Sequence, residues 1–263
     1  MNWSHELGVL SKAIEMAGAE ILGQGAEGFD THIKPDQSPV TSADLAVNQI
    51  LRSHLLERFP EDGWLSEESP DDDVRLQKSR IWIVDPIDGT KAFIRGEPEF
   101  CISAALVEQG RPVVAAILNP STQEFFSATR GGGLHLNQEP VAPPKILEGQ
   151  QPVLAVSPWE QHLGRFKSLG SHVASRPMRS IAWALALAAS GRIHAVATFE
   201  PENEWDVAAG TLLVEEAGGS MYDGDGQSLD FNRPNPRYRG VIATHVSCPD
   251  FIRRLLRSVG HLG

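Results

Sequence analysis

The fold is decided by residues 82–93, Trp82-Ile83-Val84-Asp85-Pro86-Ile87-Asp88-Gly89-Thr90-Lys91-Ala92-Phe93. The apolar run from Ile81 to Val84 predicts a buried strand, and two carboxylates three positions apart follow it. Because Pro86 has a fixed φ and no N–H to donate, we expect regular strand pairing to end there. Asp85 and Asp88 would then be free to converge at the exit of the strand.

The residues after Asp88 are of the types that bind an anion. The pair Asp88-Gly89 predicts a turn, and Thr90 is able to cap a short helix whose free amides favour negative charge. Two carboxylates beside a phosphate repel it unless cations intervene, so the pattern predicts hard metal ions with oxygen ligands. An ordinary acidic Asp-Pro and Asp-Gly turn is the structural alternative.

Length and composition limit the class of protein. The 263 residues, 41% hydrophobic and 22% charged, suffice for a large core, as one domain or as two joined lobes. A formal net charge of −11 without a basic block argues against nucleic-acid polymers and anionic membranes as partners. Cys101 and Cys248 lie far apart and fit reduced thiols in the cytoplasm. No stretch approaches the ~18 apolar residues of a membrane span.

Two further acidic residues lie upstream, at the ends of predicted elements. Apolar spacing predicts helices from Ser4 to Gly23 and from Thr41 to Phe59, with Thr41 as the N-cap of the second. Asp44 falls at the third position, where a carboxylate completes a capping box. Glu67-Glu68 ends a short strand at 64–69, and two adjacent strand ends would bring Glu67 to Asp85.

The rest of the chain predicts more β-structure and then alternating elements. Short β-branched and aromatic runs from 100 to 137 predict an antiparallel meander, and Pro140 to Pro152 predicts a connection between lobes. The second half alternates strand and helix patterns, which indicates an α/β layer. Expected strands are 153–156, 193–199 and 240–244, and expected helices are 159–169, 180–190, 207–217 and 249–259. Asp206 would be the N-cap of the helix at 207–217, or a further acid of the site.

These acidic junctions, together with Gly89-Thr90, resemble the inositol monophosphatase superfamily of metal-dependent, lithium-sensitive phosphatases. The resemblance covers nearly the whole chain and rests on residues 82–90, Glu67-Glu68 and Glu204-Trp205-Asp206-Val207-Ala208-Ala209-Gly210. It implies an α/β fold of alternating α/β/α/β/α layers, formed by a single domain 1–263. The N-terminal α+β lobe would span about 1–145 and the C-terminal α/β lobe about 146–263. Dimers are frequent in the superfamily, so a homodimer is a candidate assembly.

Within the superfamily, the chain most resembles the bacterial 3'(2'),5'-bisphosphate nucleotidases of sulfur assimilation. Two positions depart from the pattern: Arg179-Ser180 replaces a frequent Gly-Ser or Gly-Thr, and Glu200 replaces a frequent Gly. The resemblance implies hydrolysis of 3'-phosphoadenosine 5'-phosphate to AMP and phosphate. Inositol 1-phosphate and related sugar, polyol or histidinol phosphates are the alternatives. The segments that carry the similarity are 34–44, 65–68, 89–94 and 201–206.

The resemblance also implies the metal ligands. Glu67, Asp85 and the carbonyl of Ile87 would hold one Mg²⁺, and Asp85, Asp88 and Asp206 would hold a second. A third, looser ion is expected near Glu67. Carboxylate and carbonyl oxygens suit Mg²⁺, and the absence of His and Cys at these junctions argues against zinc.

Catalytic and substrate roles follow from the same resemblance. Thr90, with Asp44 behind its hydroxyl, would hold the attacking water, with Glu67 as a third catalytic residue. The amides of Gly89 and Thr90 would cradle the phosphate. A nucleotide also needs cations for its second phosphate, and Lys91, Arg95 and Arg179 are candidates. The substrate-binding residues implied are Gly89, Thr90, Lys91, Arg179, Ser180 and Glu200.

Three other interpretations fit the sequence less well. The Asp-x-Asp-Gly-Thr motif of haloacid-dehalogenase phosphatases would need its second acid one position before Asp88. Asp223-Gly224-Asp225-Gly226 suggests a calcium loop, but Ser228 stands where that loop requires Gly. A regulatory binding protein on the same fold should have lost a metal ligand, and none is missing.

Overall fold

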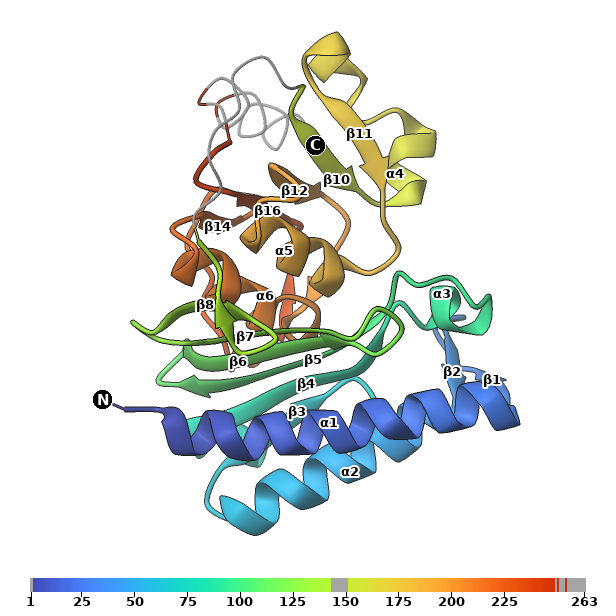
Figure 1. Cartoon of the computed structure of the whole chain (residues 1–263), viewed down its shortest axis with the longest axis vertical. Coiled ribbons are helices and arrows are strands. Elements are labelled where there is room, and N and C mark those ends of the chain that lie inside the picture. The colour runs from blue at the N-terminus through green and yellow to red at the C-terminus, as the bar shows by residue number, and fades with distance from the viewer. Residues whose placement is uncertain (1, 143–150, 249, 251–253, 255–263) are drawn as a thin grey trace.

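The computed structural model describes residues 2–142, 151–248, 250 and 254, and it has five alternating layers (Figure 1). Helices α1 (Ser4–Glu27) and α2 (Ser42–Arg58) cover one face of a seven-stranded sheet. Helices α5 (Ile181–Ala189) and α6 (Glu204–Glu216) lie between that sheet and a five-stranded sheet. The segment that contains α4 (Pro158–Leu163) covers the outer face of the second sheet. The predicted α/β/α/β/α layering is confirmed.

The first sheet contains the predicted meander. Its order is β3-β4-β5-β6-β7-β8-β9, with β3 and β4 parallel and every other pair antiparallel. Its strands are β3 (Gly63–Ser66), β4 (Arg80–Asp88), β5 (Cys101–Glu108), β6 (Arg111–Asn119), β7 (Glu124–Thr129), β8 (Gly133–Leu136) and β9 (Glu139–Pro140).

The second sheet is mixed, with order β11-β10-β12-β16-β14, and its first three strands are parallel. These strands are β10 (Val153–Val156), β11 (Ala174–Pro177), β12 (Ala195–Thr198), β14 (Ser220–Asp223) and β16 (Val241–Thr244). The remaining elements are the pairs β1 (Thr31–Ile33) with β2 (Pro39–Thr41) and β13 (Glu202–Asn203) with β15 (Arg237–Tyr238), the short helix α3 (Thr90–Ile94), and the 3-10 helices η1 (Asp73–Gln77) and η2 (Lys167–His172).

Strand β4 is buried on both faces, which fixes the position of its acidic end. Ile81 and Ile83 pack into the core around α5 and α6, whereas Trp82 and Val84 pack against α1 and α2. Burial of each such side chain contributes about 1.5–3 kcal/mol. This two-sided burial explains why the sequence is continuously apolar here instead of alternating.

Several predicted helices have different boundaries in the structure, and the first, predicted to end at Gly23, continues to Glu27. The prediction of a helix at 159–169 is wrong. Helix α4 ends at Leu163, and Gly164 adopts a left-handed conformation with φ of 67°. The helix expected to begin at Val207 begins at Glu204 instead. The predicted helix at 249–259, the connection at 140–152 and the lobe boundary near 145 lie largely or wholly outside the described residues. In the described part of the chain, no helix has the length and apolar character needed to cross a bilayer.

Candidate active site

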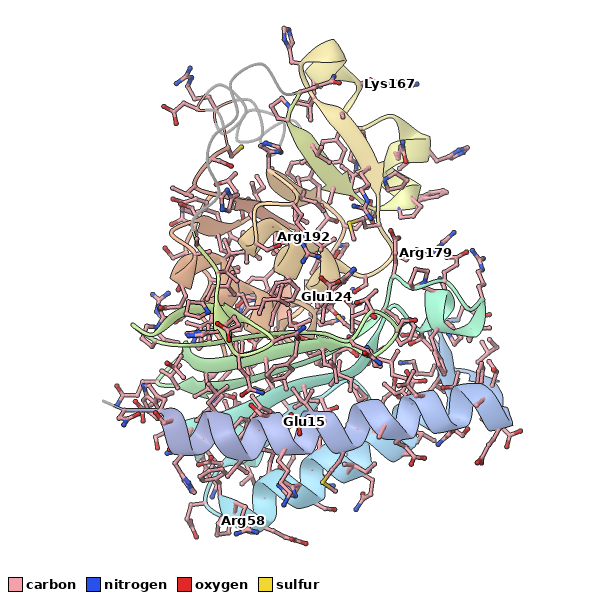
Figure 2. The ribbon with its side chains drawn as sticks, in the orientation of Figure 1. Glu15, Arg58, Glu124, Lys167, Arg179 and Arg192 are labelled. Carbon is pink, nitrogen blue, oxygen red and sulfur yellow. The ribbon has the colours of Figure 1, made fainter. Side chains whose placement is uncertain are left out.

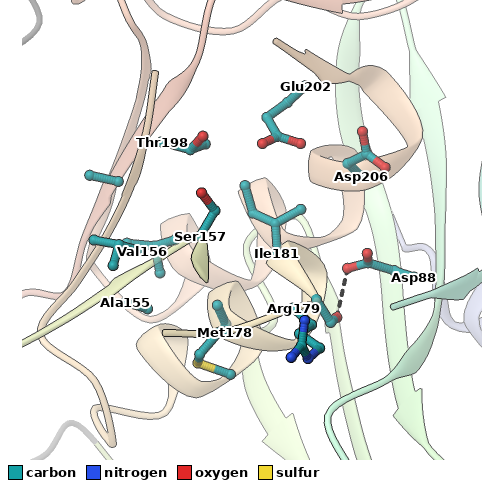
Figure 3. A pocket seen from close by; sticks show the side chains of 14 residues that line it. Asp88, Ala155, Val156, Ser157, Met178, Arg179, Ile181, Thr198, Glu202 and Asp206 are labelled. Atoms are coloured by element: carbon teal, nitrogen blue, oxygen red, sulfur yellow. Dashed lines mark hydrogen bonds between the residues drawn. The ribbon is translucent and has the colours of Figure 1, made fainter. Parts of the chain in front are cut away.

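Three carboxylates converge where β4 ends and α6 begins. Asp85 and Asp88 are the fourth-last and the last residue of β4, and Asp206 is in the first turn of α6. One oxygen from each of the three lies within 4.8 Å of the others. Figure 3 shows the Asp88 and Asp206 side chains at one end of a pocket. The structure therefore brings these three sequence-predicted residues together.

A bulge in β4 produces this convergence. Asp85 lies opposite Ser103 of β5 and Asp88 lies opposite Cys101, so β4 has one more residue than β5 in this interval. The extra residue falls in the Pro86 region, where an N–H is missing. Pairing was predicted to end at Pro86, which is wrong: the strand continues through the bulge to Asp88.

Burial and mutual repulsion make this cluster unfavourable without a cation. The pKa values of Asp85 and Asp206 are raised well above the usual range, first by loss of hydration and then by neighbouring carboxylates. Burial also raises the pKa of Asp88 to about 7, against the opposing effect of hydrogen bonds from Ser180 and Ala182. A bound cation would stabilise all three as carboxylates. The donors are hard oxygens, which fits Mg²⁺.

Asp44 links the start of α2 to this cluster. Its Oδ2 accepts a hydrogen bond of 2.8 Å from the Thr41 backbone N–H, within the predicted capping box. Its Oδ1 accepts one of 3.0 Å from the Thr90 hydroxyl, which also lies 3.0 Å from the Ile87 carbonyl oxygen. Asp44 is 1% exposed, and burial raises its pKa. The capping role and a role at the site are therefore compatible.

Gly89 allows the chain to turn from β4 into α3. Its φ of 92° lies in the left-handed region, and a Cβ there would approach the Glu99 carbonyl oxygen to 2.8 Å. Any other residue would be strained in this conformation. Gly89 thus places Thr90 and Lys91 beside the carboxylates.

Glu67 follows the end of β3 and lies beside the three-acid cluster, next to Asp85, as predicted from the adjacent strand ends. Ser66 pairs with Val84, so the next residues of the two strands, Glu67 and Asp85, are neighbours. Lys34 lies 2.6 Å from Glu67 and 2.8 Å from Glu68, between β1 and β2. Burial lowers the pKa of Lys34, but its hydrogen bonds to Glu67 and Glu68 and their charges outweigh this effect and raise the pKa. Lys34 was not predicted as a site residue, because nothing in the local sequence pairs it with acids over thirty residues away.

The residues before α5 divide into a buried and an exposed part. Ser180 caps α5 and donates a 2.7 Å hydrogen bond to Asp88 Oδ2, and the Ala182 N–H donates another of 2.6 Å. Arg179 forms a 2.9 Å ion pair with Glu97 on the side of the molecule that carries α3 (Figure 2). Ser180 is thus buried and supports Asp88 from the protein interior, whereas Arg179 lies at the solvent-facing edge of the site.

Two cavities meet at the carboxylates. The open one, of about 350 Å³, is lined by Thr90, Lys91, Trp159 and Arg179 in addition to the acids. The smaller one, of about 120 Å³, lies between β10, β12 and α5, and Figure 3 shows Glu202 in it.

Glu202 and Glu200 lie differently with respect to these cavities. Burial and the charges of Asp206 and Asp88 raise the pKa of Glu202 well above its usual range. Glu202 lies in the segment 201–206 but was not predicted as a site residue, because its neighbours in the fold come from other segments. Glu200 forms a 3.0 Å ion pair with Arg165 and is not among the described residues that line either cavity.

The helix-capping role of Asp206 also differs from the prediction. Asp206 is the third residue of α6 and not its N-cap, and its Oδ2 accepts a 2.6 Å hydrogen bond from the N–H of Asn203. Asp44 makes the equivalent bond to Thr41 in α2. Both acids are therefore oriented by the first turn of their own helix.

Comparisons with known proteins agree with this geometry. Residues 4–258 match the model of the inositol monophosphatase family. The 3'(2'),5'-bisphosphate nucleotidase CysQ of Escherichia coli K12 is 31% identical over 213 residues, covering 79% of this chain and 85% of CysQ. The inositol-1-monophosphatase of Rhizobium meliloti is 33% identical over 237 residues, covering 84% of this chain and 86% of that protein.

A third relative and a solved structure extend the similarity to almost the full length. The Nus factor SuhB of Xylella fastidiosa is 32% identical, covering 96% of this chain and 94% of that protein. The crystal structure of SuhB from Bartonella henselae superimposes with a TM-score of 0.84 at 27% identity, covering 98% and 99% of the two chains. This chain belongs to the inositol monophosphatase family and is a metal-dependent phosphoric monoester hydrolase.

Proposed function

We propose that the protein hydrolyses 3'-phosphoadenosine 5'-phosphate to AMP and phosphate in a Mg²⁺-dependent reaction. The observation that carries the proposal is the carboxylate cluster of Asp85, Asp88 and Asp206, which lies in a cavity whose rim holds Lys91 and Arg179. Acids in the cavity would bind metal ions at the scissile phosphate, and cations at the rim suit a second phosphate. The identity to bisphosphate nucleotidases supports this choice of substrate.

We expect the site to bind the two or three Mg²⁺ ions that the resemblance implies. Asp85, Asp88 and Asp206 would hold Mg²⁺ together, and Glu67 with the Ile87 carbonyl would complete the set. Bound Mg²⁺ supplies positive charge that lowers the pKa of a water molecule and neutralises the phosphate. Lys34, paired with Glu67 and Glu68, provides a positive charge beside the same acids.

Thr90 and Asp44 would orient the attacking water. The Asp44 carboxylate and the Ile87 carbonyl both only accept hydrogen bonds, so the single Thr90 hydroxyl proton is directed to one of these two 3.0 Å contacts. The Thr90 oxygen is then left as an acceptor toward water, which turns a lone pair of that water to the phosphorus. Glu67 would assist from the neighbouring strand. The amides of Gly89 and Thr90, at the start of α3, would bind phosphate oxygens.

A polyol monophosphate such as inositol 1-phosphate is the second candidate. The smaller cavity favours it, since Ser157, Thr198 and Glu202 line the space next to Asp88 and Asp206. Their oxygens are suitable partners for the hydroxyl groups of a polyol. The relatives named as inositol monophosphatases have similar identity to this chain.

A substrate panel distinguishes the candidates. Phosphate release would be measured at fixed Mg²⁺ from 3'-phosphoadenosine 5'-phosphate, inositol 1-phosphate, histidinol phosphate and fructose 1,6-bisphosphate. We expect kcat/KM for the nucleotide to lead by about 100-fold, equivalent to roughly 2.7 kcal/mol of transition-state discrimination. A lead for inositol phosphate would overturn the nucleotide assignment and leave the metal chemistry in place.

A further inference from the structure

We infer that Trp159 is the platform on which the purine base of the substrate stacks; this inference rests on the proposed function and assigns it a specificity residue. Trp159 is 59% exposed, although tryptophan is highly buried on average. It lines the same open cavity as Asp85, Asp88 and Asp206. An exposed indole at the rim of a polar cavity is suited to a planar aromatic ligand.

The platform is held in place without any ligand. Ser157 caps α4, and its hydroxyl donates a 3.0 Å hydrogen bond to Glu160 Oε2. Glu160 is fully buried, and its Oε1 accepts a 2.7 Å hydrogen bond from the Phe199 N–H. These bonds tie the first turn of α4 to the end of β12. Since the backbone of Trp159 is already ordered, stacking on it costs little conformational entropy.

His162 supports the indole from the same helix. The two ring centroids are 6.0 Å apart with an angle of 26° between the planes. The histidine ring therefore restrains the orientation of the indole, while more than half of the Trp159 surface remains open to a ligand. A base added to this pair would extend a stack that already exists.

The charges around the cavity match the parts of a nucleoside bisphosphate. The acids with their metal ions would take the scissile 3'-phosphate, and Lys91 and Arg179 at the rim suit the 5'-phosphate. Trp159 would take the base, and the ribose would lie between the three positions. A polyol phosphate has no aromatic group, so Trp159 should contribute nothing to its hydrolysis.

The test compares Trp159→Ala with Trp159→Phe on two substrates. For 3'-phosphoadenosine 5'-phosphate we expect Trp159→Ala to lower kcat/KM by about 10-fold to 100-fold, the range of base stacking on an aromatic side chain. The loss should be mainly in KM, because stacking holds ground state and transition state alike. Trp159→Phe should restore most of it. Hydrolysis of inositol 1-phosphate should not change in either variant.

Leu163→Ala is the matched control. Leu163 is 49% exposed on the same helix and is not among the described residues that line the cavity, so its truncation should leave both substrates unaffected. Wild-type preference for the nucleotide with an unchanged Trp159→Ala would overturn the inference and leave the proposed function standing. Equal losses on both substrates would assign Trp159 a structural role and overturn it too. A wild-type enzyme that does not prefer the nucleotide would refute the proposed function itself.

Discussion

The inner part of the open cavity and its rim are constructed differently. Inside, Asp88 is held by a hydroxyl and an amide, and Asp85 is 1% exposed at the end of a strand buried on both faces. At the rim, Lys91 and Trp159 are exposed, and Arg179 forms an ion pair with one surface glutamate. The inner carboxylates Asp85 and Asp88 are buried and oriented by hydrogen bonds, whereas the Lys91 and Trp159 side chains at the rim are exposed to solvent. We infer that the chemistry resides in the inner part and substrate choice in the rim.

The strongest test of this division is Asp88→Asn. The variant keeps an oxygen that accepts from Ser180 and Ala182 but loses the negative charge, so the fold should persist while metal binding suffers. We expect kcat to fall by about a thousandfold, equivalent to roughly 4 kcal/mol. Phosphate release in Mg²⁺ and circular dichroism would be measured together. Near-normal turnover would show that the inner carboxylates do not carry the chemistry.

Ser180→Ala probes how the inner part is positioned. The substitution removes the 2.7 Å hydrogen bond to Asp88, a bond to a charged group worth about 1.5–3 kcal/mol. We expect kcat to fall about tenfold. Ser190→Ala, at the other end of α5, removes a 3.0 Å bond to the Leu187 carbonyl and serves as the control. Equal activity of the two variants would mean that Asp88 needs no support from Ser180.

From the burial of the inner acids we also predict an unusual effect of pH on the stability of the metal-free protein. The pKa of Asp88 is about 7 in the folded state, above its value in the unfolded chain, so the folded state binds the proton more tightly. In EDTA, the melting temperature should therefore be higher at pH 6 than at pH 8, since stability falls as pH rises through this pKa. Excess Mg²⁺ at pH 8 should reverse the loss. A metal-free melting temperature that rises from pH 6 to pH 8 would contradict this.

Lys34→Met should have the smallest effect. If Glu67 is a metal ligand, as proposed, its ion pair with Lys34 competes with metal binding, so removal of Lys34 should lower the Mg²⁺ concentration for half-maximal activity. Ion pairs that are partly exposed contribute up to about 1 kcal/mol, which limits the change to about fivefold. Lys78→Met, at a more exposed and longer pair with Glu61, is the control. An increased Mg²⁺ requirement in Lys34→Met would indicate that Lys34 assists metal binding instead.

The contrast between the two parts also explains what the sequence could predict. The acids Asp44, Glu67, Asp85 and Asp88 stand directly after apolar runs or at helix starts, so local patterns placed them at the ends of elements, and the family resemblance then assigned them to one site. Lys34 and Glu202 were not selected, because their roles depend on partners that only the tertiary fold brings near.

The errors in the predicted elements have local physical causes. The helix expected at 159–169 ends early because Gly164 adopts a left-handed backbone conformation. The same break limits α4 to a short helix whose first turn carries Trp159, a residue that the sequence pattern assigned to a longer helix. The capping position of Asp206 was missed because Asn203, an equally good cap, precedes it. Hydrophobic spacing thus predicted most elements, but not their ends.

The most direct test of the central claim is a titration with Mn²⁺, followed by electron paramagnetic resonance, on wild-type protein, Asp85→Asn and Asp225→Asn. Mn²⁺ substitutes for Mg²⁺ at oxygen sites. The exposed Asp225 lies outside the cluster. We predict that Asp85→Asn loses tightly bound Mn²⁺ and phosphate release together, while Asp225→Asn keeps both. An Asp85→Asn protein that binds Mn²⁺ and releases phosphate like the wild type would contradict the assignment of the metal site.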